Sequence, residues 1–177
     1  MTFSPASQLC TDCGLCCDGT LFDIATFQPA EVDRLLALGF TIREDGSGVA
    51  FALPCHLLDG ACCTIYDERP SKCRTFRCGL LKRLDRDEVT VAEAQDVVAK
   101  AKSLRDAAAS TDADAASVQT RLARRRAVAN WRDIVDPARR MKAAALYLQL
   151  VAFDRYLDLH FRNKPVNQFG DIETSER

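Results

Sequence analysis

The chain has 177 residues, of which 47% are hydrophobic and 28% are charged, and its formal net charge is −1. This length and apolar content are enough for a buried core, whereas the near-zero charge gives no support to a general polyanion-binding protein. The N-terminus has neither a basic nor an apolar segment, and the longest apolar run, 143–153, is shorter than the about 20 residues that cross a bilayer. We therefore expect a soluble cytoplasmic protein that does not contact a membrane.

The first elements along the chain are short. Residues 10–26 are punctuated by Gly14 and Gly19 and are expected to form a loop that wraps around a site. A short helix is predicted over 29–38, because Pro29 stands where a first helical turn begins and Gly39 stands where it would end.

A small amount of β structure is expected next. Residues 41–48 indicate a turn or hairpin tip, and 49–53 a strand that ends at a proline. Residues 57–60 then turn the chain back, so that 64–66 could pair with this strand. The segment 67–78 is expected to be compact and irregular.

Helical patterns dominate after residue 78. Thr90 and Glu93 match a capping box, which predicts a helix to about Ala109, followed by a short linker over 110–114. A second helix is expected to end near Ile134, and a third begins at Asp136-Pro137. Apolar residues keep helical spacing along the third helix, at Met141, Ala145, Leu148, Ala152, Tyr156 and Leu159.

All nine cysteines fall within the first 78 residues. Four of them form the run Cys10-x-x-Cys13-x-x-Cys16-Cys17, and the others are Cys55, Cys62, Cys63, Cys73 and Cys78. In a reducing cytoplasm such clustering favours metal binding over disulfides. The odd number of cysteines also fits a fully disulfide-bonded scaffold poorly.

The spacing within the run suits metal ligation, because two intervening residues let both thiolates reach one metal ion or cluster. Zinc sites use this spacing, and ferredoxin-type iron–sulfur sites use C-x2-C-x2-C. Cys10, Cys13 and Cys16 match the latter, without its fourth cysteine and following proline. Adjacent side chains point in different directions, so Cys16 and Cys17 are expected to bind two different metals, or one to bind a metal while the other supports the ligands from beside them. This indicates a multinuclear site or two neighbouring sites. Thiolates bind both zinc and iron–sulfur clusters, so the residues leave the cofactor open between these two.

Other polar residues lie close to the cysteines in sequence. Four cations flank the last two cysteines: Arg69, Lys72, Arg74 and Arg77. Cations lower the pKa of a thiol and offset the charge of thiolates, although at least two of these four are expected to be solvated surface residues. His56 follows Cys55 directly, but a polar histidine beside the site or on the surface is favoured over a nitrogen ligand. His160 is expected to be an ordinary residue of the last helix.

The cysteines and their neighbours resemble the CxxCxxCC cysteine-cluster family, a YkgJ-like group of zinc- or iron-chelating domains. The family pattern continues after the first run with Pro54-Cys55, then with Cys63-Thr64-Ile65-Tyr66, and it ends with the segment from Arg69-Pro70 to Phe76-Arg77-Cys78. The resemblance covers roughly residues 10–80 and implies eight metal-ligating thiolates: Cys10, Cys13, Cys16, Cys17, Cys55, Cys63, Cys73 and Cys78. Cys62 is surplus to this set and is expected not to be a ligand.

Together these observations predict a mainly α protein. An irregular Cys-rich metal-binding module with a short β-hairpin, residues 1–80, is expected to pack on a C-terminal helical hairpin or three-helix bundle, residues 81–165. Residues 166–177 are expected to be a flexible tail, and the whole chain one compact unit.

The segment 121–142 carries eight basic and two acidic residues. It could dock an acidic protein partner, although a basic face that packs beside the acidic Cys-rich module is favoured. Nucleic-acid binding is not favoured, because no known nucleic-acid motif accompanies the charge.

Three functions remain open from the sequence. In the first, a thiolate-held zinc or iron–sulfur centre acts in redox chemistry, metal handling or modification of a partner. In the second, zinc holds a scaffold whose helices bind a partner protein. In the third, the cysteines exchange between thiol and disulfide without a metal. The sequence contains no P-loop, G-x-G-x-x-G or G-x-S-x-G motif that would indicate another catalytic chemistry.

Overall fold

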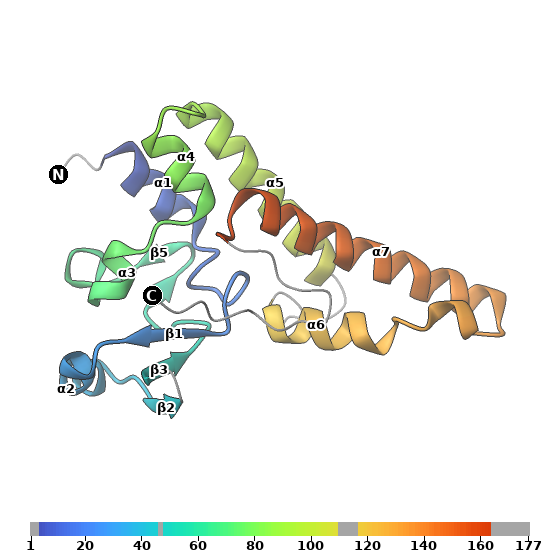
Figure 1. Cartoon of the computed structure of the whole chain (residues 1–177), viewed down its shortest axis with the longest axis horizontal. Coiled ribbons are helices and arrows are strands. Elements are labelled where there is room, and N and C mark those ends of the chain that lie inside the picture. The colour runs from blue at the N-terminus through green and yellow to red at the C-terminus, as the bar shows by residue number, and fades with distance from the viewer. Residues whose placement is uncertain (1–3, 46–47, 110–116, 164–177) are drawn as a thin grey trace. The chain divides into compact units, whose positions relative to one another are not determined.

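A computed structural model describes residues 4–45, 48–109 and 117–163 of the chain, which forms two compact units, Met1–Arg77 and Cys78–Arg177 (Figure 1). Helices predominate and the sheets are small, which confirms the prediction of a mainly α protein. Within the described ranges, none of the helices has the length and apolar character needed to cross a membrane.

The N-terminal unit contains two small antiparallel sheets. Strand β3 (Gly48–Ala52) lies in the centre of the first sheet, between β1 (Ile24–Phe27) and β2 (Arg43–Asp45). Ala25 is paired with Phe51 across β1 and β3. The second sheet is the hairpin of β4 (Leu58–Asp59) and β5 (Cys62–Cys63).

Short helices join these strands. The helix α1 (Pro5–Cys13) precedes β1, the 3-10 turn η1 (Pro29–Glu31) runs directly into α2 (Val32–Ala37), and η2 (Tyr66–Glu68) leads to α3 (Ser71–Thr75). An aromatic core lies against the first sheet, where the ring of Phe51 stacks on those of Phe40 and Phe27 at centroid distances of 4.1 Å and 4.7 Å. Leu35 of α2 completes this core.

The structure confirms some predictions for this unit and corrects others. The predicted helix over 29–38 is present as η1 and α2, and the predicted strand over 49–53 as β3. The predicted loop over 10–26 is confirmed for 14–23 but is wrong at both ends, because 10–13 belong to α1, which Ser4 caps, and 24–26 belong to β1. Residues 64–66 do not pair with β3, since β1 and β2 already occupy both of its edges.

The C-terminal unit is helical. Its elements are α4 (Gly79–Asp85), α5 (Val91–Ala109), α6 (Val118–Ala127), the 3-10 turn η4 (Trp131–Asp133) and α7 (Pro137–His160). The capping box is confirmed, because the Glu93 amide donates to the Thr90 hydroxyl at 3.2 Å and the Thr90 amide donates to the Glu93 carboxylate at 2.7 Å. Asp136 caps α7 as predicted.

The second predicted helix is shorter than expected. Helix α6 ends at Ala127, not near Ile134, because the chain must turn back through η4 before α7 can pack against α6. The predicted linker 110–114 and the tail 166–177 lie outside the described residues.

An ion-pair network is buried among the helices of this unit. The guanidinium of Arg121 is fully buried and lies 3.2 Å from the carboxylate of Asp154, which is also buried. Arg125 and Arg162 approach the same carboxylate at 3.2 Å and 3.6 Å. A buried guanidinium is tolerated only when an anion compensates it, so Asp154 holds α6 to α7 electrostatically.

Replacing Asp154 by alanine should lower the free energy of unfolding of the C-terminal unit by about 3–5 kcal/mol, since Arg121 would remain buried without its anion. Urea unfolding followed by fluorescence of the single tryptophan, Trp131, measures this loss. The matched control is Asp96→Ala on the exposed side of α5, which should change stability by less than about 0.5 kcal/mol. Equal effects of the two substitutions would contradict the role of Asp154.

Candidate metal centre

The cysteines of the N-terminal unit come from helices, turns and strands that are distant in sequence. Cys10 and Cys13 lie on α1, Cys16 and Cys17 in the turn that follows it, and Cys55 between β3 and β4; Cys62 and Cys63 form β5, and Cys73 lies on α3. No disulfide joins any of the nine cysteines, all of which lie in described segments. The seven predicted ligands of this unit are half-buried, whereas Cys62 is exposed.

Five thiols from these segments are close enough to affect one another's ionisation. Burial, followed by the neighbouring thiols of Cys73, Cys55, Cys10 and Cys63, raises the pKa of Cys17 to about 12. Burial and the thiols of Cys55 and Cys63 raise the pKa of Cys73 to about 11. The pKa values of Cys10 and Cys55 are also raised, mainly by burial. The structure therefore gathers Cys10, Cys17, Cys55, Cys63 and Cys73, which we call the five-thiol group. The raised pKa values keep Cys10, Cys17, Cys55 and Cys73 neutral at physiological pH.

Backbone contacts hold the segments of the five-thiol group together. The Cys55 amide donates to the Cys17 carbonyl at 2.8 Å, which ties the turn after α1 to the loop after β3. Gly14 ends α1 with a φ of +70°, a conformation that favours glycine. A Cβ atom on Gly14 would lie only 2.9 Å from the Cα atom of Ala61, so the end of α1 packs directly on the β4–β5 hairpin.

Glu31 positions the helix that carries Cys73. Its carboxylate accepts hydrogen bonds from the Ser71 amide at 2.8 Å and from the Ser71 hydroxyl at 2.6 Å, and these bonds lower the Glu31 pKa. Glu31 thereby satisfies a donor at the first turn of α3. The sequence gives no sign of this role, because Glu31 and Ser71 are 40 positions apart and no local pattern links them.

Two cations from the predicted group of four lie beside a thiol. Arg69 hydrogen-bonds to the Cys10 thiol and opposes the effect of burial on its pKa, and the charge of Arg77 acts in the same direction. The guanidinium of Arg69 is held over the ring of Tyr66, 3.5 Å from its centroid, and donates to the Tyr66 carbonyl at 2.7 Å. Arg69 is thus a fixed positive charge beside the five-thiol group.

The remaining predicted ligands have other surroundings. Cys13 closes α1, and Cys16 lies in the turn before Cys17. Cys78 opens the C-terminal unit, where it is buried and its sulfur accepts from the Leu81 amide at 3.5 Å as the cap of α4. The role of these three residues as ligands stays a prediction, as does that of Cys62 as a non-ligand.

Neither histidine has a ligand's surroundings within its own unit. The Nε2 atom of His56 is 3.0 Å from the Leu38 carbonyl, to which it can only donate, and the ring packs edge-on against Phe40. The ring of His160 lies 4.4 Å from that of Tyr156 on the same helix, and burial lowers its pKa.

The five-thiol group matches a soft metal in its chemistry but is not a closed coordination shell. In the described part of the chain, no three Cys, His, Asp or Glu side chains are arranged so that they could hold a metal ion as they stand. Zinc and iron both bind thiolates, and these sulfurs come from loops and short elements that could close around such an ion. The donor set therefore fits a thiolate-bound metal, provided that binding draws the segments together.

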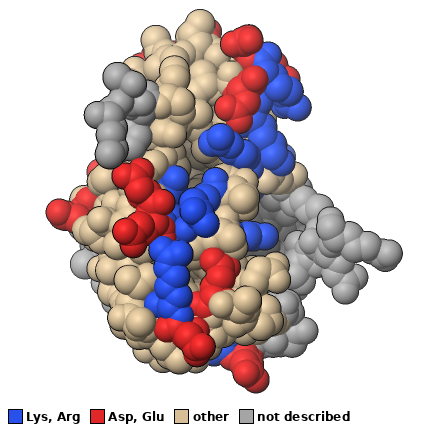
Figure 2. All heavy atoms as spheres, turned by 90° about the vertical axis from the view of Figure 1, so that its left-hand side faces the viewer, with Lys and Arg blue, Asp and Glu red and all other residues tan. Residues whose placement is uncertain are grey.

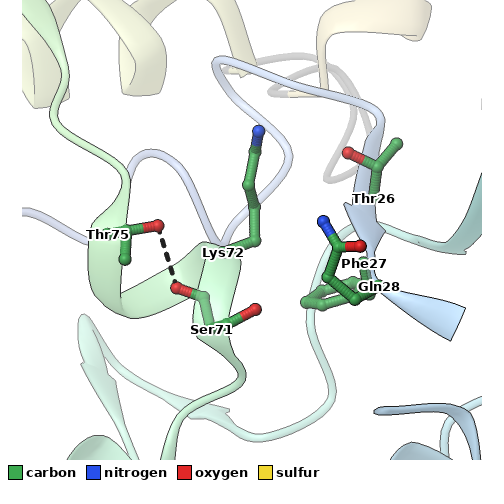
Figure 3. Close-up of a pocket in the computed structure, with 6 residues that line it drawn as sticks. All are labelled: Thr26, Phe27, Gln28, Ser71, Lys72 and Thr75. Carbon is green, nitrogen blue, oxygen red and sulfur yellow. Dashed lines mark hydrogen bonds between the residues drawn. The ribbon is translucent and has the colours of Figure 1, made fainter. Parts of the chain in front are cut away.

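A hollow of about 320 Å³ lies beside this group, between the end of β1 and α3 (Figure 3). Its lining is polar apart from Phe27 and includes no cysteine: Thr26, Phe27, Gln28, Ser71, Lys72 and Thr75. The Thr75 hydroxyl donates to the Ser71 carbonyl at 3.0 Å and so belongs to α3 itself. Because no cysteine lines the hollow, it is distinct from the five-thiol group. Phe27 nevertheless belongs both to the wall of the hollow and to the hydrophobic core against which Cys73 packs.

The basic segment 121–142 presents less charge to solvent than its sequence indicates. Arg121 and Arg125 bind Asp154 in the interior, and Arg124 donates to the Ala108 carbonyl at 2.9 Å. The exposed basic residues of the segment are Arg126, Arg132, Arg139, Arg140 and Lys142. Figure 2 draws another part of the surface, the side that lies at the left in Figure 1, where basic and acidic side chains are interspersed.

In the reduced, metal-free protein, Cys17 should react with iodoacetamide at least about 10-fold more slowly than the exposed Cys62 at pH 8. Burial and neighbouring thiols raise the Cys17 pKa, so a smaller fraction of Cys17 is present as the thiolate, which is the nucleophile. A thiolate with a higher pKa is a stronger nucleophile, but this offsets only part of the smaller thiolate fraction. Mass spectrometry of the alkylated peptides over time measures both rates. The difference should disappear in urea, and equal rates in the folded protein would contradict burial of Cys17.

Gly14→Ala should weaken the contact between α1 and the β4–β5 hairpin. The substitution combines an unfavourable positive φ with a clash against the Ala61 backbone, at a cost of about 2–4 kcal/mol. The matched control is Gly60→Ala, where φ is also positive but no atom lies within 4 Å, so the cost should be about 1 kcal/mol. Amide hydrogen exchange of the peptide 14–21 measures both, and equal costs would exclude the packing contact.

A sequence model of the CxxCxxCC family, whose description reads "Putative zinc- or iron-chelating domain", matches residues 9–103, which is more than half of the chain. No characterised protein and no solved structure matches the chain significantly. The matched range includes all nine cysteines, because it begins before Cys10 and ends after Cys78. The chain belongs to the CxxCxxCC family of zinc- or iron-chelating domains.

Proposed function

We propose that this protein binds a zinc or iron–sulfur centre through cysteine thiolates, and that this centre is its functional site. The proposed ligands are Cys10, Cys13, Cys16, Cys17, Cys55, Cys63, Cys73 and Cys78. The observation that carries the proposal is the five-thiol group, in which thiols from four separate parts of the N-terminal unit lie close enough together to raise the pKa values of Cys17 and Cys73. Membership of a zinc- or iron-chelating family supports it.

The electrostatics of the five-thiol group favour a cation. Deprotonating several buried thiols together is costly, because each thiolate loses hydration and repels the others. A bound metal ion reverses both effects, since it replaces the protons and neutralises the thiolates. Arg69 and Arg77 would offset part of the remaining negative charge.

Metal binding on this proposal is coupled to closure of the N-terminal unit. The seven proposed ligands of this unit lie on α1 and the turn after it, the loop after β3, the β4–β5 hairpin and α3, and each of these segments is short. Drawing the sulfurs together would therefore order several segments at once and would release protons. Thiolate chemistry of this kind suits a reducing compartment such as the cytoplasm.

A structural zinc module is the second candidate. It is favoured by the short helices and strands of the N-terminal unit, which are not long enough to be stable by themselves. Zinc would then supply folding energy, and the exposed end of the basic segment, around Arg139 and Arg140, would bind an acidic protein partner. Eight thiolates exceed the four ligands of one structural zinc, which favours a larger or second centre.

Anaerobic purification followed by metal analysis and an absorption spectrum tests the proposal. Bound iron with sulfide and broad absorbance near about 400 nm would identify an iron–sulfur cluster, and stoichiometric zinc without colour would identify zinc. The double substitution Cys16→Ser and Cys17→Ser should lower the metal content by at least about half, because two proposed ligands are lost.

The matched control is Cys62→Ser, which removes the exposed thiol beside a proposed ligand and should leave the metal content unchanged. Circular dichroism of the helices verifies that the variants remain folded. Purified protein that contains no metal, and takes up neither zinc nor iron under reducing conditions, would refute the proposed function.

A further inference from the structure

Helix α7 carries a stripe of apolar residues on its exposed side. Met141, Leu148 and Leu159 are 74%, 60% and 74% exposed, and Ala145 and Ala152 between them are exposed as well. Arg155 is the charged member of the same stripe. We call these six residues the α7 seam: Met141, Ala145, Leu148, Ala152, Arg155 and Leu159.

The C-terminal unit does not use the seam for its own core. Residues on the other side of α7, namely Leu150, Phe153 and Leu157, are fully buried where α7 packs with α5 and α6 (Figure 1). A helix that packs on one side only is expected to be polar on the other. Apolar residues on both sides of α7 therefore indicate a second packing partner. The sequence spacing had indicated only one apolar stripe along this helix.

The spacing within the seam indicates that the partner is another helix. Successive members are separated by 4, 3, 4, 3 and 4 residues, which is the 3.5-residue period of helices that pack side by side. The seam spans 18 residue steps, or about 27 Å of helix.

We propose that the α7 seam binds the seam of a second copy of this chain, with the two helices antiparallel across a twofold axis near Leu150. In this register, Leu148 lies at the level of the second copy's Ala152, and Met141 at the level of its Leu159. The pair of Leu148 and Ala152 places a large residue opposite a small one, so that the side chains interdigitate. The pair of Met141 and Leu159 fills each end of the seam. Twofold symmetry repeats each contact, which makes the interface self-complementary.

The charge of Arg155 selects the antiparallel arrangement. In a parallel pair, Arg155 would face the second copy's Arg155 in the interface, and like charges so placed repel. In the antiparallel pair, each Arg155 lies opposite the second copy's Ala145, where its methylene stem can cover the small residue while the guanidinium reaches solvent. The single charged residue of the seam therefore favours one orientation.

Sedimentation equilibrium of the full chain tests the proposal, with an expected mass of twice that of the chain. Leu148→Glu should raise the dimer dissociation constant by at least about 100-fold, because each copy loses a buried leucine and gains a charge. The matched control is Arg139→Gln, an equal change of charge at an exposed position of α7 on the side opposite to the seam, which should leave the dimer intact.

The orientation has its own test. Ala152→Lys alone should weaken the dimer, because the added side chain meets the second copy's large Leu148, whereas Arg155 meets a small alanine. The double variant Leu148→Glu with Ala152→Lys should restore the dimer, because the new carboxylate and ammonium face each other between antiparallel copies. Failure of the double variant to associate, while circular dichroism shows intact helices, would overturn the antiparallel pairing.

A monomeric wild-type chain, or a dimer that is insensitive to Leu148→Glu, would overturn the proposal, since the seam would then be covered from within the same chain or not at all.

Discussion

Several thiols buried side by side can persist in a protein interior only while they are neutral or while a cation compensates their charge. This constraint explains the arrangement of the N-terminal unit. Burial keeps Cys17 and Cys73 protonated, and their neighbours oppose ionisation further. Arg69, held over Tyr66, supplies a fixed positive charge beside Cys10. On the proposed function, a metal cation would replace the protons of these thiols.

The scaffold around these thiols depends on a few specific contacts. Gly14 lets α1 approach the β4–β5 hairpin, the Cys55 amide ties two loops together, and Glu31 holds the first turn of α3. None of these elements is long enough to be stable by itself. The same electrostatic rule operates in the C-terminal unit, where Asp154 compensates the buried Arg121.

Elements with strong local signals were predictable. The capping box at Thr90 and Glu93 and the Asp136-Pro137 start placed two helices correctly, because these residues satisfy backbone groups a few positions away. Local sequence could not show whether 64–66 would pair with the strand at 49–53, since this depended on which strands occupy the two edges of β3. Helix α1 had a usable signal in Ser4-Pro5 and Gly14, which the cysteine run obscured.

The sequence by itself determined the donor chemistry of the candidate site and its family, because cysteine spacing and the residues between the cysteines are local properties of the chain. Only the tertiary structure decided which thiols meet, since their segments are brought together by contacts such as Glu31 with Ser71 across 40 positions. It also decided which arginines of the basic segment are buried and which side of α7 faces solvent. Both choices depend on how whole helices pack, and periodicity alone leaves that packing open.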